Sequence, residues 1–480
     1  MGCKYTYFCP PMGGRKTPLP LISELEIVGA AAEGKAIGRW NEKVVFVAYA
    51  VPGDIVNVQV FKKKKNFLEG RITKLVKPSP LRLEPICSHF GVCGGCKWQN
   101  MAYADQLKFK EKQVGDSLTR IGKIALPEIY PIMGSEKTEY YRNKLEYTFS
   151  YSRWLTQEQV DSNEEIPERR GVGFHIPGMF DKILDIDTCY LQSDLSNQIR
   201  LHIKKLGIDH DLSFYNVREH SGLLRNLIVR TSTLDHLMVV VSFGADEEEN
   251  IQMVLESLKS TFPQITSLNY VVNTKMNDTL YDQEIICFHG DDFIEEVMED
   301  LKFKIGPKSF FQTNSLQAFE LYKVTRKYAE ITDSDVVYDL YTGTGTIANF
   351  VARSAKKVVG IESVPEAIED AHVNSARNKI SNTTFVAGDM MKILDEAFMA
   401  EHGKPSVIIT DPPRAGMHEK VCEQILGSGA KTVVYVSCNP ATQARDLAIL
   451  DAKYKVTKVQ PVDMFPHTHH VENVVQLKLK

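Results

Sequence analysis

A cysteine and a glutamate near the C-terminal end of the chain have the side chains of a nucleophile and a base. Cys438 ends an apolar run, TVVYVSC, that predicts a buried strand, and Glu472 follows 34 residues later in HVENVVQLKL. A cysteine is more often a buried structural residue, but the strand-end position before Asn439-Pro440 favours a nucleophile. A thiolate and a carboxylate together suit chemistry on a carbon that is attacked first and deprotonated afterwards.

A glycine-rich segment upstream has the spacing of a nucleotide-cofactor loop. DLYTGTGTIA (339–348) contains G-x-G-x-x-A, and Glu362 farther on could bind a ribose hydroxyl of either NAD or S-adenosylmethionine. Two later strands end in acids, VAGD at Asp389 and DPPR at Asp411, which favours a methyltransferase over an NAD enzyme. Arg414 follows the two prolines where amino-methylating enzymes carry an aromatic residue, so methylation of an amino group is disfavoured.

Three cysteines within ten residues have the spacing of metal ligands. Cys87, Cys93 and Cys96 form C-x5-C-G-G-C, a pattern that suits zinc or an iron–sulfur cluster. Either metal usually takes four ligands, and Cys189 is favoured over His89 as the fourth. Two other cysteines are expected to be ordinary core residues: Cys287 and Cys422.

The elements that must position these residues alternate between strand and helix from about residue 335. Apolar runs such as VVYDLY, KVVGIES and SVIITDPP, separated by helix-like stretches, predict a doubly wound α/β fold with a parallel sheet. Ligands collect at the carboxyl ends of such strands. The last two runs, VTKVQPVDMF and ENVVQLKLK, have no helix between them and predict a hairpin with an antiparallel last strand. If that strand lies beside TVVYVSC, Glu472 lies near Cys438.

The first part of the chain predicts a small β-barrel with a basic face. Short period-two runs occupy residues 21–82, and residues 1–86 hold 14 Lys and Arg against 7 Asp and Glu. The whole chain has a net charge of −4, so only a local basic surface could contact nucleic acid phosphates. Lys62–Lys65 fall where a hairpin should turn, as a solvated turn or as a phosphate contact, and the local charge favours contact.

Length and composition indicate a soluble, multidomain protein of a reducing compartment. The chain has 480 residues, no apolar run of 18 residues and nine unevenly placed cysteines. We therefore expect no membrane segment, a cytoplasmic location and two to four domains, and nothing demands more than a monomer. A helix is predicted at 103–120 and an exposed acidic insert at 156–169.

Taken together, the motifs resemble the RNA uracil-C5 methyltransferases, most closely the bacterial branch that acts on 23S ribosomal RNA. SFFQTN, DLYTGTG, DPPRAG, VSCNP and HVE occur in the family in this order, and residues 21–80 resemble a TRAM domain. CSHFGVCGGCKWQ resembles the family's motif for a [4Fe–4S] cluster. The resemblance implies three domains: a TRAM/OB-like β-barrel that binds RNA (21–82), a central α+β iron–sulfur domain whose helix 103–120 packs on the catalytic domain (83–300), and a C-terminal α/β Rossmann-like methyltransferase domain (301–480). An N-terminal extension (1–20) and the insert near 156–169 fall outside the resemblance.

The resemblance also implies roles for particular residues. Cys438 would attack C6 of the uracil to form a covalent adduct, and Glu472 would remove the C5 proton. The implied S-adenosylmethionine-binding residues are Gln312, Tyr341, Thr346, Glu362, Asp389 and Asp411. The implied cluster ligands are Cys87, Cys93, Cys96 and Cys189.

Three alternatives stay open beside methylation of 23S ribosomal RNA. A uracil-C5 methyltransferase acting on tRNA would share the C-terminal half, but that branch typically lacks the TRAM domain and the cluster cysteines. A non-catalytic RNA-binding assembly factor would not need the intact set of Cys438, Glu472 and cofactor residues. An NAD-dependent oxidoreductase with a metal module would use the glycine-rich loop differently.

Overall fold

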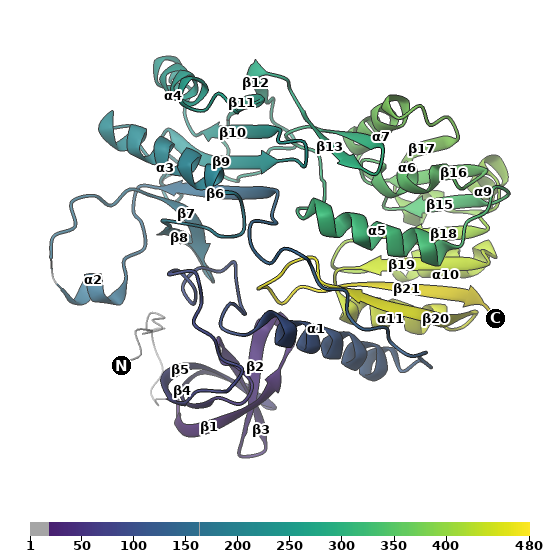
Figure 1. Ribbon diagram of the computed structural model, residues 1–480, viewed down its shortest axis with the longest axis horizontal. Coiled ribbons are helices and arrows are strands. Elements are labelled where there is room, and N and C mark those ends of the chain that lie inside the picture. Colours follow the sequence, from purple (N-terminus) through teal and green to yellow (C-terminus); the bar gives the residue numbers. More distant parts are fainter. Residues whose placement is uncertain (1–18, 163) are drawn as a thin grey trace.

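The computed structural model describes residues 19–162 and 164–480, so the expected extension at 1–20, with Cys3 and Cys9, lies almost wholly outside the described residues. The described chain forms a small closed barrel, a seven-stranded central sheet, a two-stranded hairpin and a seven-stranded C-terminal sheet (Figure 1). Among the described residues, no helix is long and apolar enough to cross a membrane.

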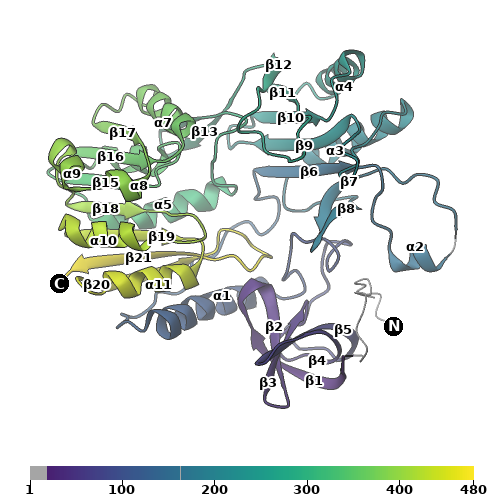
Figure 2. The same cartoon turned by 180° about the vertical axis from the view of Figure 1, so that it is seen from behind.

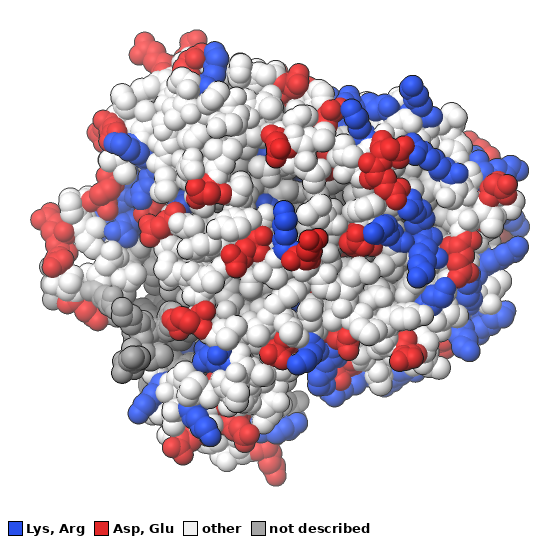
Figure 3. All heavy atoms as spheres, in the orientation of Figure 1, with Lys and Arg blue, Asp and Glu red and all other residues white. Residues whose placement is uncertain are grey.

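The N-terminal part is a closed five-stranded barrel with the strand order β1-β2-β3-β5-β4. Alternate residues of β4, Val56, Val58 and Val60, point into its core because side chains of a strand alternate between its two faces. The hairpin predicted at Lys62–Lys65 is confirmed. Figure 3 shows both basic and acidic side chains on the face of the barrel seen in that view. The strands are β1 Leu21–Ala30, β2 Lys35–Trp40, β3 Lys43–Ala48, β4 Ile55–Lys63 and β5 Phe67–Lys77.

The central part is a seven-stranded sheet whose two faces enter different cores. Leu227 and Val229 of β9 pack with α3 and α4, whereas Ile228 between them packs toward the C-terminal part. The sheet order is β12-β11-β10-β9-β6-β7-β8. The strands are β6 Lys144–Ser150, β7 Gly171–Ile176, β8 Met179–Asp185, β9 Leu224–Thr231, β10 Leu237–Phe243, β11 Ser267–Val272 and β12 Ile286–Gly290; the helices are α2 Gln157–Asp161, within the predicted insert, α3 Asp194–Asp209 and α4 Glu248–Thr261.

One cysteine was placed wrongly by the sequence pattern. Cys287 was expected in the core, but it lies on β12, the edge strand of the central sheet, and is exposed. An edge strand is covered on one side only, so an apolar run there does not ensure burial. Cys422 is buried in α10 as expected.

The C-terminal part is the predicted doubly wound sheet, with the order β17-β16-β15-β18-β19-β21-β20. The first five strands of this order are parallel, and β21 inserts antiparallel between β19 and β20, which confirms the predicted hairpin. The strands are β15 Val336–Leu340, β16 Lys357–Glu362, β17 Thr383–Ala387, β18 Val407–Thr410, β19 Thr432–Ser437, β20 Tyr454–Val462 and β21 Glu472–Leu479. A separate hairpin, β13 Ile294–Met298 and β14 Leu301–Ile305, precedes them.

Helices cover both faces of this sheet (Figure 2). In β19, Val434 and Val436 join the core with α5, α6 and α7, whereas Val433 and Tyr435 join the core with α10 and α11. The helices are α5 Ser315–Ala329, α6 Thr346–Ala352, α7 Pro365–Arg377, α8 Met390–Ile393, α9 Glu396–His402, α10 Glu419–Ser428 and α11 Pro440–Leu450.

Helix α1, Tyr103–Ser117, packs against both the barrel and the C-terminal part. It continues into a π-helical turn, Leu118–Gly122, and lies between the barrel and the C-terminal sheet (Figure 1). Its Val114, with Leu118 of the following turn, belongs to the core beside α10 and α11.

Candidate active site

Cys438 and Glu472 are brought together by two neighbouring antiparallel strands. Ser437, the last residue of β19, pairs with Asn473 of β21, so the next position on each strand sets Cys438 opposite Glu472. Glu472 is only 4% exposed. The predicted proximity of the two residues is therefore confirmed.

Acidic groups surround this pair. Burial, followed by the charge of Glu472, raises the pKa of Cys438 to about 12. Burial, followed by the charge of Asp411, holds the pKa of Glu472 well above its usual range, and burial followed by the charge of Asp339 raises the pKa of Asp411 to about 7. A nearby cation would favour the ionised form of each group. The electrostatics of the site therefore suit a positively charged ligand.

Arg414 supplies a positive charge from the loop after β18. Its charge lowers the pKa of both Cys438 and Glu472, against the larger effect of burial. Its backbone carbonyl accepts hydrogen bonds from Asn439 Nδ2 at 3.0 Å and Thr442 Oγ1 at 3.1 Å. Because Asn439 also caps α11, the loop is fixed against the start of that helix, next to Cys438.

The glycine-rich loop joins β15 to α6 and approaches its neighbours closely. Gly345 has a φ of 77°, and a Cβ there would lie 2.9 Å from that of Ala371. Tyr341, at the end of β15, also has a positive φ, 65°. The carboxylate of the buried Asp339 accepts a hydrogen bond from Thr342 Oγ1 at 2.6 Å, and burial raises its pKa to about 7.

Two of the predicted cofactor residues organise this edge of the sheet. Glu362, at the end of β16, accepts hydrogen bonds from the Gly343 N–H at 3.3 Å and from the Ser363 N–H at 2.7 Å. Asp389 caps α8 by accepting from the Met391 N–H at 3.0 Å. Apart from the two residues next to it in the chain, no heavy atom of the described residues lies within 4 Å of the position of a Cβ on Gly343, so a ligand could approach the loop there.

The remaining predicted cofactor residues lie nearby. Gln312 hydrogen-bonds to the buried Tyr322, whose pKa is raised by burial and then by the charges of Asp411 and Asp339. Thr346 begins α6, is nearly buried, and has its Oγ1 3.3 Å from that of Thr344. Tyr341, Glu362, Asp389 and Asp411 thus lie at or just after the carboxyl ends of β15, β16, β17 and β18, the edge of the sheet at which β19 leads to Cys438.

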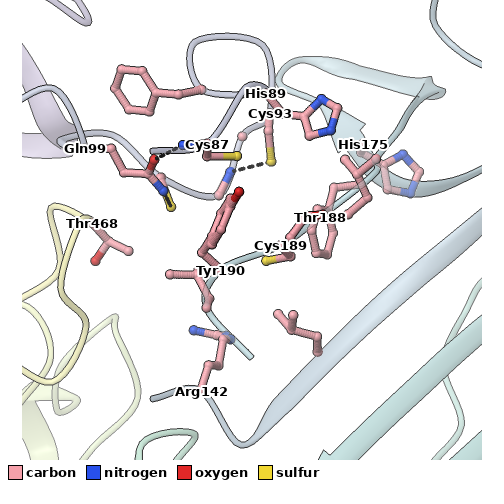
Figure 4. A pocket seen from close by; sticks show the side chains of 18 of the residues that line it. Cys87, His89, Cys93, Gln99, Arg142, His175, Thr188, Cys189, Tyr190 and Thr468 are labelled. Carbon is pink, nitrogen blue, oxygen red and sulfur yellow. Dashed lines mark hydrogen bonds between the residues drawn. The ribbon is translucent and has the colours of Figure 1, made fainter. Parts of the chain in front are cut away.

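The four candidate ligand cysteines line one cavity of about 300 Å³, although Cys189 is about a hundred residues from the others. Figure 4 shows the thiols of Cys87, Cys93 and Cys189 pointing toward a common space. Gln99 Nε2 donates to Cys96 Sγ at 3.2 Å. Burial raises the pKa of all four thiols, to about 11 for Cys93.

The positions of these four cysteines do not by themselves support the expected iron–sulfur domain. Among the described residues, no group of three or more His, Cys, Asp or Glu side chains is arranged to hold a metal ion. His89, the alternative fourth ligand, lines the cavity, but its Nε2 already accepts from the Asp187 N–H at 2.9 Å. Cys189 is therefore the better match of the two.

Sequence reasoning missed the network that supports the loop between β20 and β21. Lys110 Nζ donates to Asp463 Oδ1 at 2.6 Å, and both side chains are fully buried. The carbonyl of His467 accepts from the Lys97 N–H at 2.8 Å, and Gln106 Oε1 accepts from the His467 N–H at 2.9 Å. The four-residue spacing of Gln106, Lys110 and the buried Val114 puts them on one helix face, a signal present in the sequence.

Comparison with known proteins agrees with this geometry. Residues 231–480 match the tRNA (Uracil-5-)-methyltransferase family, and residues 22–73 match the TRAM domain. An uncharacterized RNA methyltransferase of Bacteroides thetaiotaomicron is 56% identical over 94% of this chain and 100% of its own length, and one of Chlorobaculum tepidum is 40% identical over 94% and 95%.

A solved structure extends the likeness to almost the whole chain. The Pyrococcus abyssi tRNA (uracil-54, C5)-methyltransferase, in complex with S-adenosyl-L-homocysteine, has a TM-score of 0.72 and 28% identity, covering 94% of this chain and 100% of that one. The fold and the matches define an S-adenosylmethionine-dependent RNA methyltransferase. The chain belongs to the RNA uracil-5-methyltransferase family, which sets aside the NAD oxidoreductase and the non-catalytic assembly factor.

Proposed function

We propose that this chain methylates C5 of a uridine in 23S ribosomal RNA, with Cys438 as the nucleophile and Glu472 as the base. The observation that carries the proposal is the opposition of these two residues across β19 and β21, at the sheet edge that also holds the glycine-rich loop. A thiol and a carboxyl at one sheet edge can act in turn on the same substrate: the thiol adds to a carbon, and the carboxylate then removes a proton.

The reaction needs a covalent intermediate because uracil C5 is a weak nucleophile. Cys438 Sγ forms a bond to C6, and the electrons of the C5–C6 double bond move into an enolate that concentrates charge on C5. C5 then bonds to the methyl group of S-adenosylmethionine, whose sulfur keeps the electron pair of the broken S–CH₃ bond. Glu472 takes the C5 proton, and the S–C6 bond breaks to restore the double bond.

Both protein groups must lose a proton before they act. In the site without ligands, the pKa of Cys438 is raised to about 12 and that of Glu472 is also raised, each chiefly by burial. Arg414 and the start of α11 both favour the thiolate. The sulfonium of S-adenosylmethionine supplies a further positive charge and the methyl group.

The acidic groups at this edge of the sheet fit this cofactor. The carboxyls of Asp339, Asp411 and Glu472 are suited to a cation, and the space beside Gly343 is open. Glu362 lies where an acid can bind ribose hydroxyls. The residues proposed to hold S-adenosylmethionine are Gln312, Tyr341, Thr346, Glu362, Asp389 and Asp411.

We also propose that Cys87, Cys93, Cys96 and Cys189 hold a [4Fe–4S] cluster. The supports are four free thiols that line one cavity and the family motif that three of them form. The methyl transfer needs no electron transfer, so we assign the cluster a structural role. The backbone N–H groups of Lys97 and Trp98, just after Cys96, donate to the carbonyl of His467. A bound cluster would therefore stabilise the loop that leads to Glu472.

The RNA must present an unstacked uridine. The target base leaves its stack at a cost of a few kcal/mol, which is lower in loops and bulges. The TRAM barrel would contact the RNA backbone. The domain content favours 23S ribosomal RNA, but the Pyrococcus abyssi enzyme, named for a tRNA uridine, matches nearly the whole chain. Uracil-C5 methylation of tRNA is therefore the second candidate.

The substrate test is tritium release from RNA labelled with [5-³H]uridine, using 23S fragments and bulk tRNA side by side with S-adenosylmethionine. Release from a 23S fragment alone supports the proposal, and release from tRNA alone moves the assignment to the second candidate. No release from either, with folded protein, would contradict C5 chemistry.

A further inference from the structure

His470 contacts the guanidinium of Arg414. Arg414 Nη2 lies 3.4 Å from His470 Nδ1. A guanidinium has donors only, so the ring nitrogen must accept this hydrogen bond and be unprotonated. Burial, followed by the charges of His469 and Arg414, lowers the pKa of His470 to about 3, so the imidazole is neutral.

The ring of His470 is held from several sides. It packs on the ring of His469 at a centroid distance of 4.1 Å and edge-on to Phe465 at 6.3 Å. Its backbone N–H donates to Thr468 Oγ1 at 3.2 Å. It also forms part of the wall of the cysteine cavity. Its position is therefore fixed by the loop between β20 and β21.

That loop is anchored outside the C-terminal sheet. The carbonyl of His467 accepts hydrogen bonds from Lys97 and Trp98, and the carbonyl of Pro466 accepts one from Tyr141 Oη at 3.0 Å. Figure 1 shows this loop reaching from β20 and β21 toward α1 and the cysteine-rich connector. His470 thus links the anchored loop between β20 and β21 to the loop that carries Arg414.

The position of Arg414 matters because its charge acts on both members of the proposed catalytic pair. Its backbone is fixed by Asn439 and Thr442, but those contacts do not direct the guanidinium. The contact between Arg414 Nη2 and His470 Nδ1 does fix the direction of the guanidinium.

We propose that His470 is a positioning residue that holds the Arg414 guanidinium beside Cys438 and Glu472. The inference rests on the proposed roles of that pair. Without an acceptor at position 470, the guanidinium moves away and less of Cys438 is present as thiolate.

The test compares His470→Phe, which keeps a ring but removes the acceptor, with His470→Asn, whose Oδ1 can accept near the place of Nδ1. The first readout is the rate of covalent adduct formation with substrate RNA. The loss of a hydrogen bond to a charged group predicts a rate lowered about tenfold to a hundredfold in His470→Phe. His470→Asn should recover most of this rate, and the KM for S-adenosylmethionine should change little.

A second readout does not depend on turnover. The rate of iodoacetamide alkylation of Cys438 in the free protein, followed by peptide mapping, reports the thiolate fraction. This rate should be highest in the wild type, slightly lower in His470→Asn and lowest in His470→Phe. A double-mutant cycle with Arg414→Ala separates positioning from packing: His470→Phe should add little once Arg414 is absent. His470→Leu serves as the acceptor-free variant if His470→Phe does not fold.

The outcomes are distinguishable. If the wild-type protein forms no adduct, or if Cys438→Ala keeps its turnover, the proposed function itself fails. If the wild-type forms the adduct and acceptor-free variants match it, the inference is overturned. Equal losses in His470→Phe and His470→Asn, or a full effect of His470→Phe in the Arg414→Ala background, would also overturn it.

Discussion

Cys438 and Glu472 occupy facing positions one step beyond the Ser437–Asn473 pair that ends the ladder between β19 and β21. The antiparallel insertion of β21 makes this possible, because it returns a residue near the C-terminus to the carboxyl edge of the parallel strands. Two groups that are far apart in sequence thereby share a buried site with the glycine-rich loop.

Cys438→Ala should lower methylation by about 10³-fold or more, because the enolate then has no means of forming. RNA binding, measured by filter retention, should stay within about threefold of wild type, since the barrel proposed to contact the RNA is unchanged. Cys422→Ala, which removes a buried thiol of α10 outside the proposed catalytic pair, serves as the control for cavity formation. Turnover in Cys438→Ala near the wild-type rate would remove Cys438 as nucleophile.

Glu472→Gln should slow resolution of the adduct by about 10²–10⁴-fold, because the C5 proton has no base. A species carrying both RNA and the transferred methyl group should accumulate and run as a shifted band on a denaturing gel. A slow variant that accumulates no methylated adduct would assign the base to another group.

Binding of S-adenosylmethionine should strengthen relative to S-adenosylhomocysteine as pH rises from 6 to 8. The pKa values of Asp339 and Asp411 are each raised to about 7, chiefly by burial, so both carboxyls ionise over this range and then favour the sulfonium. Calorimetry should show the affinity ratio rising roughly threefold to tenfold. Asp411→Asn should flatten the trend, and a ratio independent of pH in the wild type would contradict the electrostatic account.

The same two acids give the protein without ligands a pH-dependent stability. A carboxyl with a raised pKa keeps its proton in the folded protein where the unfolded chain has lost it. Its stabilising contribution is complete below about pH 4 and is lost as pH rises through about 7. S-adenosylmethionine should therefore raise the thermal midpoint more at pH 8 than at pH 6.

The fold of the C-terminal half could be predicted because its signals are local. Runs such as TVVYVSC and the absence of a helix before Glu472 predict both the parallel sheet and its antiparallel strand. The pairing of Lys110 with Asp463 spans 353 positions and has no local pattern that names the partner. Cys287 was wrongly expected in the core because a run of apolar residues does not tell an edge strand from a central one.

Lys110→Met should destabilise the protein by about 3–5 kcal/mol, because it leaves Asp463 buried and unpaired. Denaturant unfolding followed by fluorescence measures this change. Lys112→Met on the same helix is the matched control: Lys112 is 62% exposed and pairs with Asp116 at the surface, so its loss should cost under about 1 kcal/mol. Similar effects of the two changes would contradict the importance of the buried pair.

Cys96→Ser should abolish iron binding in protein purified without oxygen and lower the thermal midpoint by about 5 °C or more. Cys287→Ser, on the exposed edge strand, should change neither quantity. Zinc in place of iron in the wild-type protein, or iron retained by Cys96→Ser, would contradict the cluster assignment.

The most direct test of the account uses substrate RNA containing 5-fluorouridine, which cannot release its C5 substituent as a proton. Incubation with S-adenosylmethionine followed by nuclease digestion, proteolysis and mass spectrometry should find a methylated 5-fluorouracil nucleotide bonded to the peptide that contains Cys438. A wild-type protein that methylates normal RNA yet forms no such adduct, or forms it on a different cysteine, would contradict the central claim.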